Sequence, residues 1–145
     1  VDKLYTKGIS DYQERIGHYM PFNITVIPAL KNTKSLSEDQ QKQAEGELIL
    51  RLIQPSDTVV LLDEHGAERT SMEMATWLTR KQQTARRLVF IIGGPYGFSA
   101  DVYGRADEKI SLSRMTFSHQ MVRLIFVEQL YRACTIIRGE SYHHE

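Results

Sequence analysis

Two loops of this 145-residue chain combine residue types that could bind a small ligand. The first, Gly93-Gly94-Pro95-Tyr96-Gly97, directly follows a short apolar run. Paired glycines let backbone N–H and C=O groups approach a ligand closely, so an adenine or a ribose could lie against them. The same residues also suit a tight turn between a strand and a helix, and both interpretations stay open. The loop lacks the GxGxxG and Walker A spacings, which disfavours NAD binding and ATP hydrolysis.

The second loop, residues 113–118, mixes small hydroxyls, one cation and apolar side chains. Ser118 suits the N-cap of a following helix, which explains that residue without any ligand. Met115 and Phe117 are not explained in this way, because each needs an apolar surface to pack against. A ligand-binding loop and a simple helix start therefore both remain open.

Titratable side chains gather near the end of the chain. Tyr142, His143 and His144 form either a frayed terminus or a movable acid–base group. Glu128 and Arg132 lie four residues apart and can pair on one helix face, which at a solvated surface is worth about 0.3–0.5 kcal/mol. We expect no metal, because CxxC and HExxH spacings are absent and two adjacent histidines make a poor site.

The elements that must position these loops alternate between helix and strand. The run at 58–62 is continuously apolar and β-branched, which is typical of a strand buried on both faces. The pattern therefore predicts an α/β fold with a parallel or mostly parallel sheet flanked by helices. We expect helices at 2–16, 37–53, 70–83, 99–107 and 119–138, strands at 23–27, 58–62, 88–92 and 109–112, and a loop at 64–67.

The helix at 37–53 has two competing start signals. Ser37 with Gln40 and Ser35 with Glu38 both have the spacing of a capping box. The apolar periodicity predicts a buried face made by Leu48, Ile49, Leu52 and Ile53.

In open α/β sheets, ligands lie beyond the carboxyl ends of the strands. Three loops leave such ends here, after Leu62, after Ile92 and after Leu112. If these strands are neighbours in the sheet, the loops converge on one site.

Composition restricts the class of protein further. The length suits one domain spanning residues 1–145. Lys and Arg total 18, as do Asp and Glu, so bulk charge does not attract nucleic acid, although a local basic face remains compatible with this balance. A single cysteine, Cys134, and the lack of a signal peptide indicate a reducing, cytoplasmic location. No apolar run approaches the ~20 residues of a membrane span, so we expect no membrane partner.

The last predicted helix is apolar around most of its circumference. Such a helix is buried on more than one side, and a small domain can achieve this by covering it with a second subunit. The pattern therefore favours a homodimer.

The stretch from Leu88 to Glu145 resembles the carboxyl half of the ribosomal RNA large subunit methyltransferase H family, which has the knotted SPOUT fold. A weaker likeness precedes it, in Glu45-Gly46 and Leu61-Leu62-Asp63. The matching segments are Phe90-Ile91-Ile92-Gly93-Gly94-Pro95, Ile110-Ser111-Leu112-Ser113, Met115-Thr116-Phe117-Ser118-His119-Gln120, Arg123, Glu128-Gln129-Leu130-Tyr131-Arg132-Ala133, Gly139-Glu140 and Tyr142-His143.

Two features depart from the family pattern. The family opens with a short apolar strand ahead of its first helix, and that strand is absent here, so we expect residues to be missing at the front. His144 stands where some relatives carry arginine.

The resemblance implies a SPOUT α/β-knot with a carboxyl-terminal trefoil knot. It also implies a homodimer with sites at the subunit interface, S-adenosylmethionine as cofactor, and methylation of N3 of a pseudouridine in 23S ribosomal RNA on assembled 70S ribosomes. Carried over by position, the cofactor-binding residues are Leu62, Gly93, Leu112, Ser113, Arg114, Met115, Thr116 and Phe117.

We expect four side chains to surround the target base, with His143 as the proton acceptor. They are His119, Arg132, Tyr142 and His143. Two alternatives stay open: a non-catalytic, dimeric nucleotide-binding α/β module, and a related knotted transfer RNA methyltransferase.

Overall fold

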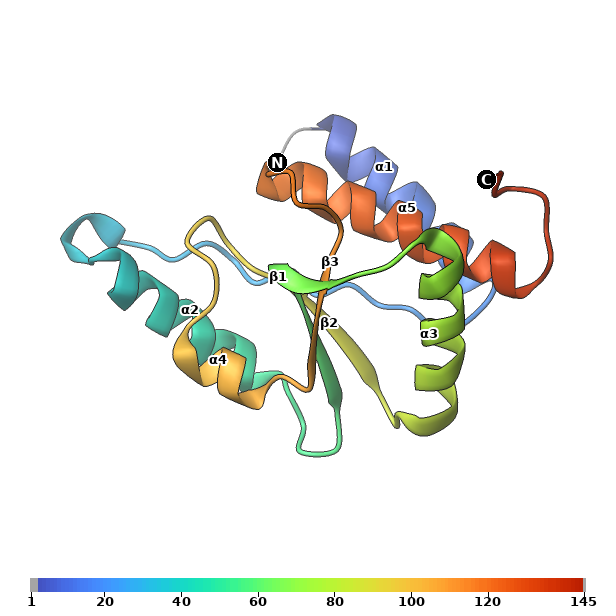
Figure 1. The fold of residues 1–145 in the computed structure, drawn as a ribbon. Coiled ribbons are helices and arrows are strands. Elements are labelled where there is room, and N and C mark those ends of the chain that lie inside the picture. The colour runs from blue at the N-terminus through green and yellow to red at the C-terminus, as the bar shows by residue number, and fades with distance from the viewer. Residues whose placement is uncertain (1–2, 145) are drawn as a thin grey trace.

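The structure is a computed structural model that describes residues 3–144. Figure 1 shows a sheet with helices on both sides. The helices are α1 (Lys3–Gly17), α2 (Glu38–Arg51), α3 (Ser71–Thr84), α4 (Ala100–Arg105) and α5 (His119–Ile137), with a 3₁₀ turn η1 at Thr33–Ser35, and the strands are β1 (Thr58–Glu68), β2 (Leu88–Ile92) and β3 (Glu108–Ser111).

The three strands are parallel and lie in the order β2-β1-β3. The central strand β1 is the most deeply buried, since Val59, Val60 and Leu61 are at most 1% exposed. Helices α2 and α4 cover one face of the sheet, and α1, α3 and α5 cover the other (Figure 1). This arrangement confirms the predicted α/β class with a parallel sheet.

Side-chain caps fix where the helices begin. Of the two signals before α2, the structure uses Ser37, whose Oγ accepts from the Gln40 N–H at 3.1 Å while the Gln40 side chain accepts from the Ser37 N–H at 2.8 Å. Thr70 forms the same capping box at α3, and Ser118 caps α5 as predicted. These caps determine the residue at which each of the three helices begins.

The loop expected at residues 64–67 is wrong, because these residues lie within β1. A register shift between Leu62 and Ala67 lets the strand rejoin β3, where Ala67 pairs with Ile110. Gly66 makes this possible, since a Cβ there would lie 2.6 Å from the backbone of Ile110. Periodicity could not reveal an irregularity that depends on a neighbouring strand.

The strand expected at residues 23–27 is also wrong, because this segment has no regular secondary structure. No strand of the described sheet pairs with it, and Val26 is 66% exposed. Alternating apolar residues predict a strand only where a partner strand is available.

The buried face of α2 differs in part from the prediction. Leu52 follows the last turn and is 49% exposed, whereas Ile49, Leu50 and Ile53 pack against the core.

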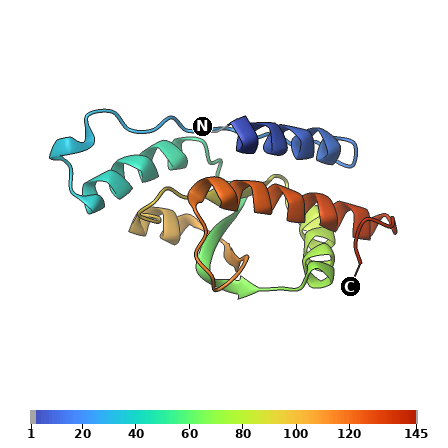
Figure 2. The same cartoon turned by 90° about the horizontal axis from the view of Figure 1, so that it is seen from above.

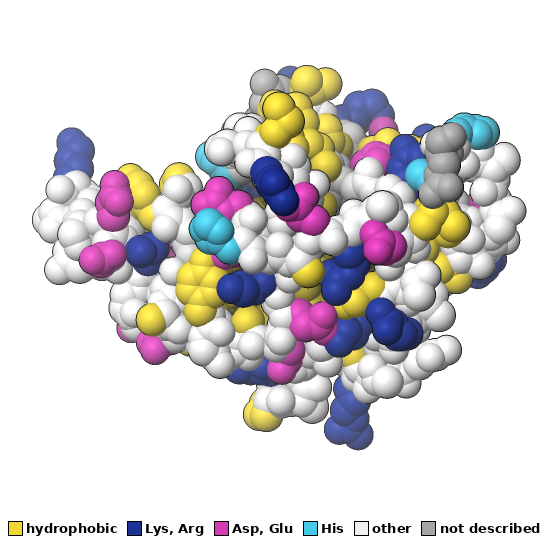
Figure 3. Space-filling model, viewed as in Figure 1, with side chains coloured by type: hydrophobic (Ala, Val, Ile, Leu, Met, Phe, Trp, Pro, Cys, Tyr) yellow, Lys and Arg dark blue, Asp and Glu magenta, His cyan; other side chains and the backbone are white. Residues whose placement is uncertain are grey.

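Helix α5 runs beside α1 and also packs on α3 (Figures 1 and 2). The approach to α1 is close, because a Cβ on Gly8 would lie 2.8 Å from Leu124 Cδ1. The two neighbours therefore account for much of the apolar circumference of α5. Hydrophobic side chains remain visible over the beginnings of α1 and α5 in Figure 3, and Leu4 is 71% exposed. Across residues 3–144, no helix combines the length and apolar content needed to cross a membrane.

Candidate functional site

The strand ends that precede the predicted ligand loops are neighbours in the sheet. Leu62 of β1 is the Cα partner of Ile92 in β2 and of Ile110 in β3. Gly93 and Leu112 follow within two residues of these partners, so three predicted cofactor-binding positions converge at the carboxyl edge. Leu62 and Leu112 are half-buried and pack at the edge of the core, which gives this edge an apolar wall.

The glycine loop forms a closed turn. The Gly97 N–H donates to the Gly94 carbonyl at 3.2 Å, and Gly97 has a φ of 82°, which favours glycine. A Cβ on Gly93 would lie 3.0 Å from the Phe98 ring, so packing also requires a glycine at this position. The turn interpretation is confirmed, and the turn places the backbone of the loop at the carboxyl edge of the sheet (the ligand edge).

Glu45 of α2 lies against this turn and was not among the predicted site residues. A Cβ on Gly94 would lie 3.0 Å from its Oε2 atom, and burial raises the pKa of its carboxyl group. The only sequence signal was the Glu45-Gly46 pair in the family likeness. A carboxylate on the glycine turn adds an acceptor for hydroxyl or amino groups to the ligand edge.

The loop after β3 is held by its own side chains. The Met115 N–H donates to Ser113 Oγ at 2.9 Å, and the Ser111 hydroxyl donates to the Ser113 carbonyl at 3.0 Å. Arg114 Nε donates to Glu68 Oε1 at 2.9 Å, which fixes the loop to β1. Met115 is 75% exposed, whereas Thr116 is exposed and Phe117 is half-buried.

This edge can hold an adenosine. Such a ligand needs an apolar wall for its ring and a few polar groups for its edges. Leu62, Leu112 and Met115 supply apolar surface, and the ordered backbone of both loops supplies polar groups. The residues present therefore fit a nucleoside-containing cofactor.

A second cluster lies at the far end of α5. Arg132 Nη2 donates to Glu128 Oε2 at 3.1 Å, and Arg132 Nη1 lies 3.0 Å from His143 Nδ1. The Tyr142 hydroxyl donates to the same Glu128 oxygen at 3.0 Å, while the Arg132 guanidinium lies 4.8 Å from the centre of the Tyr142 ring. Three of the four predicted catalytic residues are thus brought together, and Glu128 connects them.

Protonation in this cluster follows from its geometry. Burial, followed by hydrogen bonds with Tyr12 and Glu128, raises the pKa of Tyr142, so its hydroxyl stays protonated. A guanidinium can only donate, so His143 Nδ1 accepts from Arg132 and a neutral imidazole carries its proton on Nε2. In this arrangement His143 is a donor through Nε2, and accepting a proton at Nδ1 requires that Arg132 release it.

His119 lies apart from the other three predicted catalytic residues. It begins α5, directly after the loop at residues 113–118, whereas Arg132 lies near the other end of the helix. Thirteen positions at about 1.5 Å each separate the two residues by roughly 20 Å. Within one chain, the ligand edge is therefore separate from the cluster of Glu128, Arg132, Tyr142 and His143 (the Arg132 cluster).

Two partners in the cluster were missed by sequence reasoning. The spacing of Glu128 and Arg132 indicated their pairing, but not that Glu128 also holds Tyr142. The Tyr12 hydroxyl lies 3.4 Å from that of Tyr142, and no sequence signal connects residues so far apart. Among residues 3–144, no group of three or more potential metal-binding side chains occurs.

A parallel-sheet α/β domain whose loops converge at the carboxyl edge of the sheet belongs to the class of proteins that bind their ligands at that edge. A family model described as "Predicted SPOUT methyltransferase" matches residues 1–143. The chain belongs to this SPOUT methyltransferase family, which confirms the predicted family and its knotted α/β fold.

Individual relatives match over nearly the whole length. The Ribosomal RNA large subunit methyltransferase H of Phocaeicola vulgatus is 62% identical over 146 residues, which cover 100% of this chain and 93% of the relative. The protein of the same name from Bacteroides thetaiotaomicron is 61% identical with the same coverage. That of Porphyromonas gingivalis is 53% identical over 144 residues, 99% of this chain and 92% of the relative.

Proposed function

We propose that residues 1–145 form a single S-adenosylmethionine-dependent methyltransferase domain that methylates N3 of a pseudouridine in 23S ribosomal RNA. The observation that carries this proposal is the full-length identity to relatives named ribosomal RNA large subunit methyltransferases. The substrate is the assembled 70S ribosome in the cytoplasm. The geometry of the ligand edge and of the Arg132 cluster supports this function.

The cofactor binds at the carboxyl edge of the sheet. When bound, S-adenosylmethionine supplies an electrophilic methyl group on a sulfonium centre. Apolar side chains would contact its adenine, and the two loops would present backbone groups to its polar edges. The residues that hold it are Leu62, Gly93, Leu112, Ser113, Arg114, Met115, Thr116 and Phe117.

The Arg132 cluster binds and orients the target base. Arg132 donates to a carbonyl oxygen of the base, which makes its N3–H more acidic. When the base draws Arg132 away, His143 Nδ1 is released and accepts the N3 proton. Glu128 holds Tyr142 in place throughout, and holds Arg132 until the base binds. Positioning of this kind can supply much of the rate.

The enzyme works as a homodimer whose sites lie between subunits. About 20 Å of helix separates His119 and the cofactor edge from Arg132 in one chain, so a partner must bring the two clusters together. The exposed side chain of Leu4 offers apolar surface for such contacts. His119 then faces the target base from the opposite subunit.

Transfer of labelled methyl groups from S-adenosylmethionine tests the function. Assembled ribosomes that lack the modification are expected to accept label, and free transfer RNA is not. Label in transfer RNA alone would instead favour the related knotted enzyme. Calorimetry separates the non-catalytic alternative, because tight ATP or NAD binding without S-adenosylmethionine binding would support a nucleotide-binding module.

A further inference from the structure

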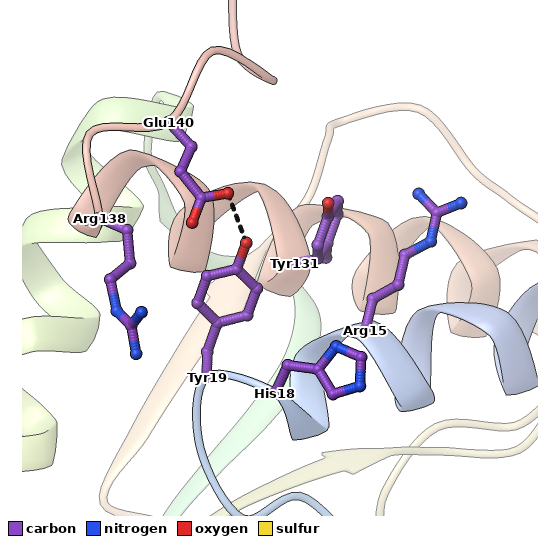
Figure 4. A pocket seen from close by; sticks show the side chains of 6 residues that line it. All are labelled: Arg15, His18, Tyr19, Tyr131, Arg138 and Glu140. Atoms are coloured by element: carbon purple, nitrogen blue, oxygen red, sulfur yellow. Dashed lines mark hydrogen bonds between the residues drawn. The ribbon is translucent and has the colours of Figure 1, made fainter.

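A pocket of about 230 Å³ lies between the ends of α1 and α5, outside both clusters described above. Figure 4 shows the side chains that line it, which come from the end of α1, the turn after it, and the end of α5, with Tyr19 and Glu140 pointing toward each other. The lining residues are Arg15, His18, Tyr19, Tyr131, Arg138 and Glu140.

Two guanidinium groups of this pocket have no carboxylate partner among the described residues. The Arg15 guanidinium lies 5.6 Å from the centre of the Tyr131 ring, and that of Arg138 lies 5.2 Å from the centre of the Tyr19 ring. Both are exposed, and Figure 4 shows them on either side of the two tyrosines. Arginines held over aromatic rings keep their donors available for an anion.

The single carboxylate of the pocket is already engaged. The Tyr19 hydroxyl donates to Glu140 Oε2 at 2.6 Å, and the Glu140 N–H donates to the Thr135 carbonyl at 2.9 Å. The hydrogen bond with Glu140 and then burial raise the pKa of Tyr19 to about 12, so the phenol stays neutral. Two guanidiniums against one carboxylate leave the pocket positive.

One aromatic ring connects the pocket to the Arg132 cluster. Tyr131 lines the pocket, and its ring centre lies 4.8 Å from that of Tyr142 in an edge-on contact. Tyr142 in turn carries Arg132 over its face. A strip of aromatic rings flanked by guanidinium groups therefore runs from Arg138 to His143, a pattern suited to an RNA strand.

We propose that this pocket binds a phosphodiester of the RNA strand beside the target nucleotide, through Arg15 and Arg138. The inference rests on the proposed function and adds a substrate contact to it. Guanidiniums match phosphate geometry, and phosphate contacts fix the register of a protein on a nucleic acid. Such a local site lets a chain of zero formal net charge hold RNA.

Arg15→Gln, Arg138→Gln and the double variant test the proposal. Arg51→Gln is the matched control, because Arg51 is exposed on α2, which covers the opposite face of the sheet. The measurements are kcat and KM for ribosomes, ribosome binding by co-sedimentation at several salt concentrations, S-adenosylmethionine affinity by calorimetry, and molecular mass by sedimentation.

Each pocket variant is expected to raise KM for ribosomes about tenfold and to reduce the slope of log affinity against log salt by about 1, with kcat, cofactor affinity and molecular mass unchanged. The control should match the unsubstituted chain. Unchanged KM and salt slope in the double variant would overturn the proposal, as would a change in mass, which would assign the pocket to a subunit contact. A failure of the proposed function is distinguishable, because the unsubstituted chain would then not methylate ribosomes at all.

Discussion

Glu128 is the residue on which the Arg132 cluster depends. One of its oxygens accepts hydrogen bonds from both Arg132 and Tyr142, so a single carboxylate fixes two of the groups proposed to face the base. Its side chain is only 20% exposed, which makes these contacts stronger than those of a solvated surface pair. Glu128 is a positioning residue, because it acts through its two partners.

Glu128→Gln is expected to lower kcat by about tenfold or more, since the charge that orients Arg132 and Tyr142 is lost. Cofactor affinity should not change, because Glu128 forms hydrogen bonds with Gln129, Arg132 and Tyr142, none of which is proposed to hold the cofactor. Single-turnover methylation and calorimetry measure the two quantities. Glu14→Gln, at an exposed position on α1, is the control. An unchanged kcat in Glu128→Gln would show that the cluster needs no such support.

His143→Ala tests the proposed proton acceptor. We expect single-turnover rates to fall by about 100-fold, within the range that general base catalysis contributes. Rates close to those of the unsubstituted chain across the pH range would remove His143 from this role.

At the scale of elements, a glycine lets α2 approach α4 and so places Glu45 on the glycine turn. A Cβ on Gly46 would lie 2.4 Å from Ser99 Oγ and 3.3 Å from Val102 Cγ2. Ser99 is the N-cap of α4 and Val102 is 1% exposed, so neither can move freely. The ligand edge therefore depends on a packing contact between two helices.

Gly46→Ala is expected to destabilise the fold by about 1–3 kcal/mol, as overpacking does. Gly104→Ala is the matched control in α4, because a Cβ there meets nothing within 4 Å. That change should stabilise the helix by about 0.5–1 kcal/mol. Denaturant unfolding of both variants gives the comparison. Equal stabilities would contradict the close approach of α2 and α4.

Sequence patterns predicted the elements best where the signal is local. The cap at Ser118 and the strand at 88–92 were confirmed, and Ser37 is the one of the two competing caps that α2 uses, because each signal depends on residues close together in the chain. The predictions of a strand at 23–27 and of a loop at 64–67 were wrong, because the structure of both segments depends on which strands are neighbours in the sheet. The same holds for the candidate site. The position of its loops could be predicted from the ends of the strands, but the contact between Tyr12 and Tyr142 could not.

At the scale of the whole molecule, the two clusters lie at opposite ends of α5. A homodimer that pairs the cofactor edge of one subunit with the Arg132 cluster of the other completes two equivalent sites. Two-fold symmetry then gives both sites the same residues, and each site takes its cofactor edge from one subunit and its Arg132 cluster from the other.

Mixed dimers test this arrangement. Met115→Glu should impair the cofactor edge without affecting the fold, because Met115 is 75% exposed, and Arg132→Ala should impair the other cluster. Each variant alone is expected to be inactive. When equal amounts are unfolded and refolded together, half of the dimers are mixed and each holds one intact site, which restores about a quarter of the activity. No restoration would place both clusters in a site within one chain.

The most direct measurement is the identity of the modified nucleoside. Ribosomes lacking the modification are incubated with the protein and S-adenosylmethionine, and the 23S ribosomal RNA is digested and analysed by mass spectrometry. The expected product is one N3-methylated pseudouridine per ribosome, absent when S-adenosylmethionine is omitted. A methyl group on another nucleoside, or none on 23S ribosomal RNA, would contradict the proposed function.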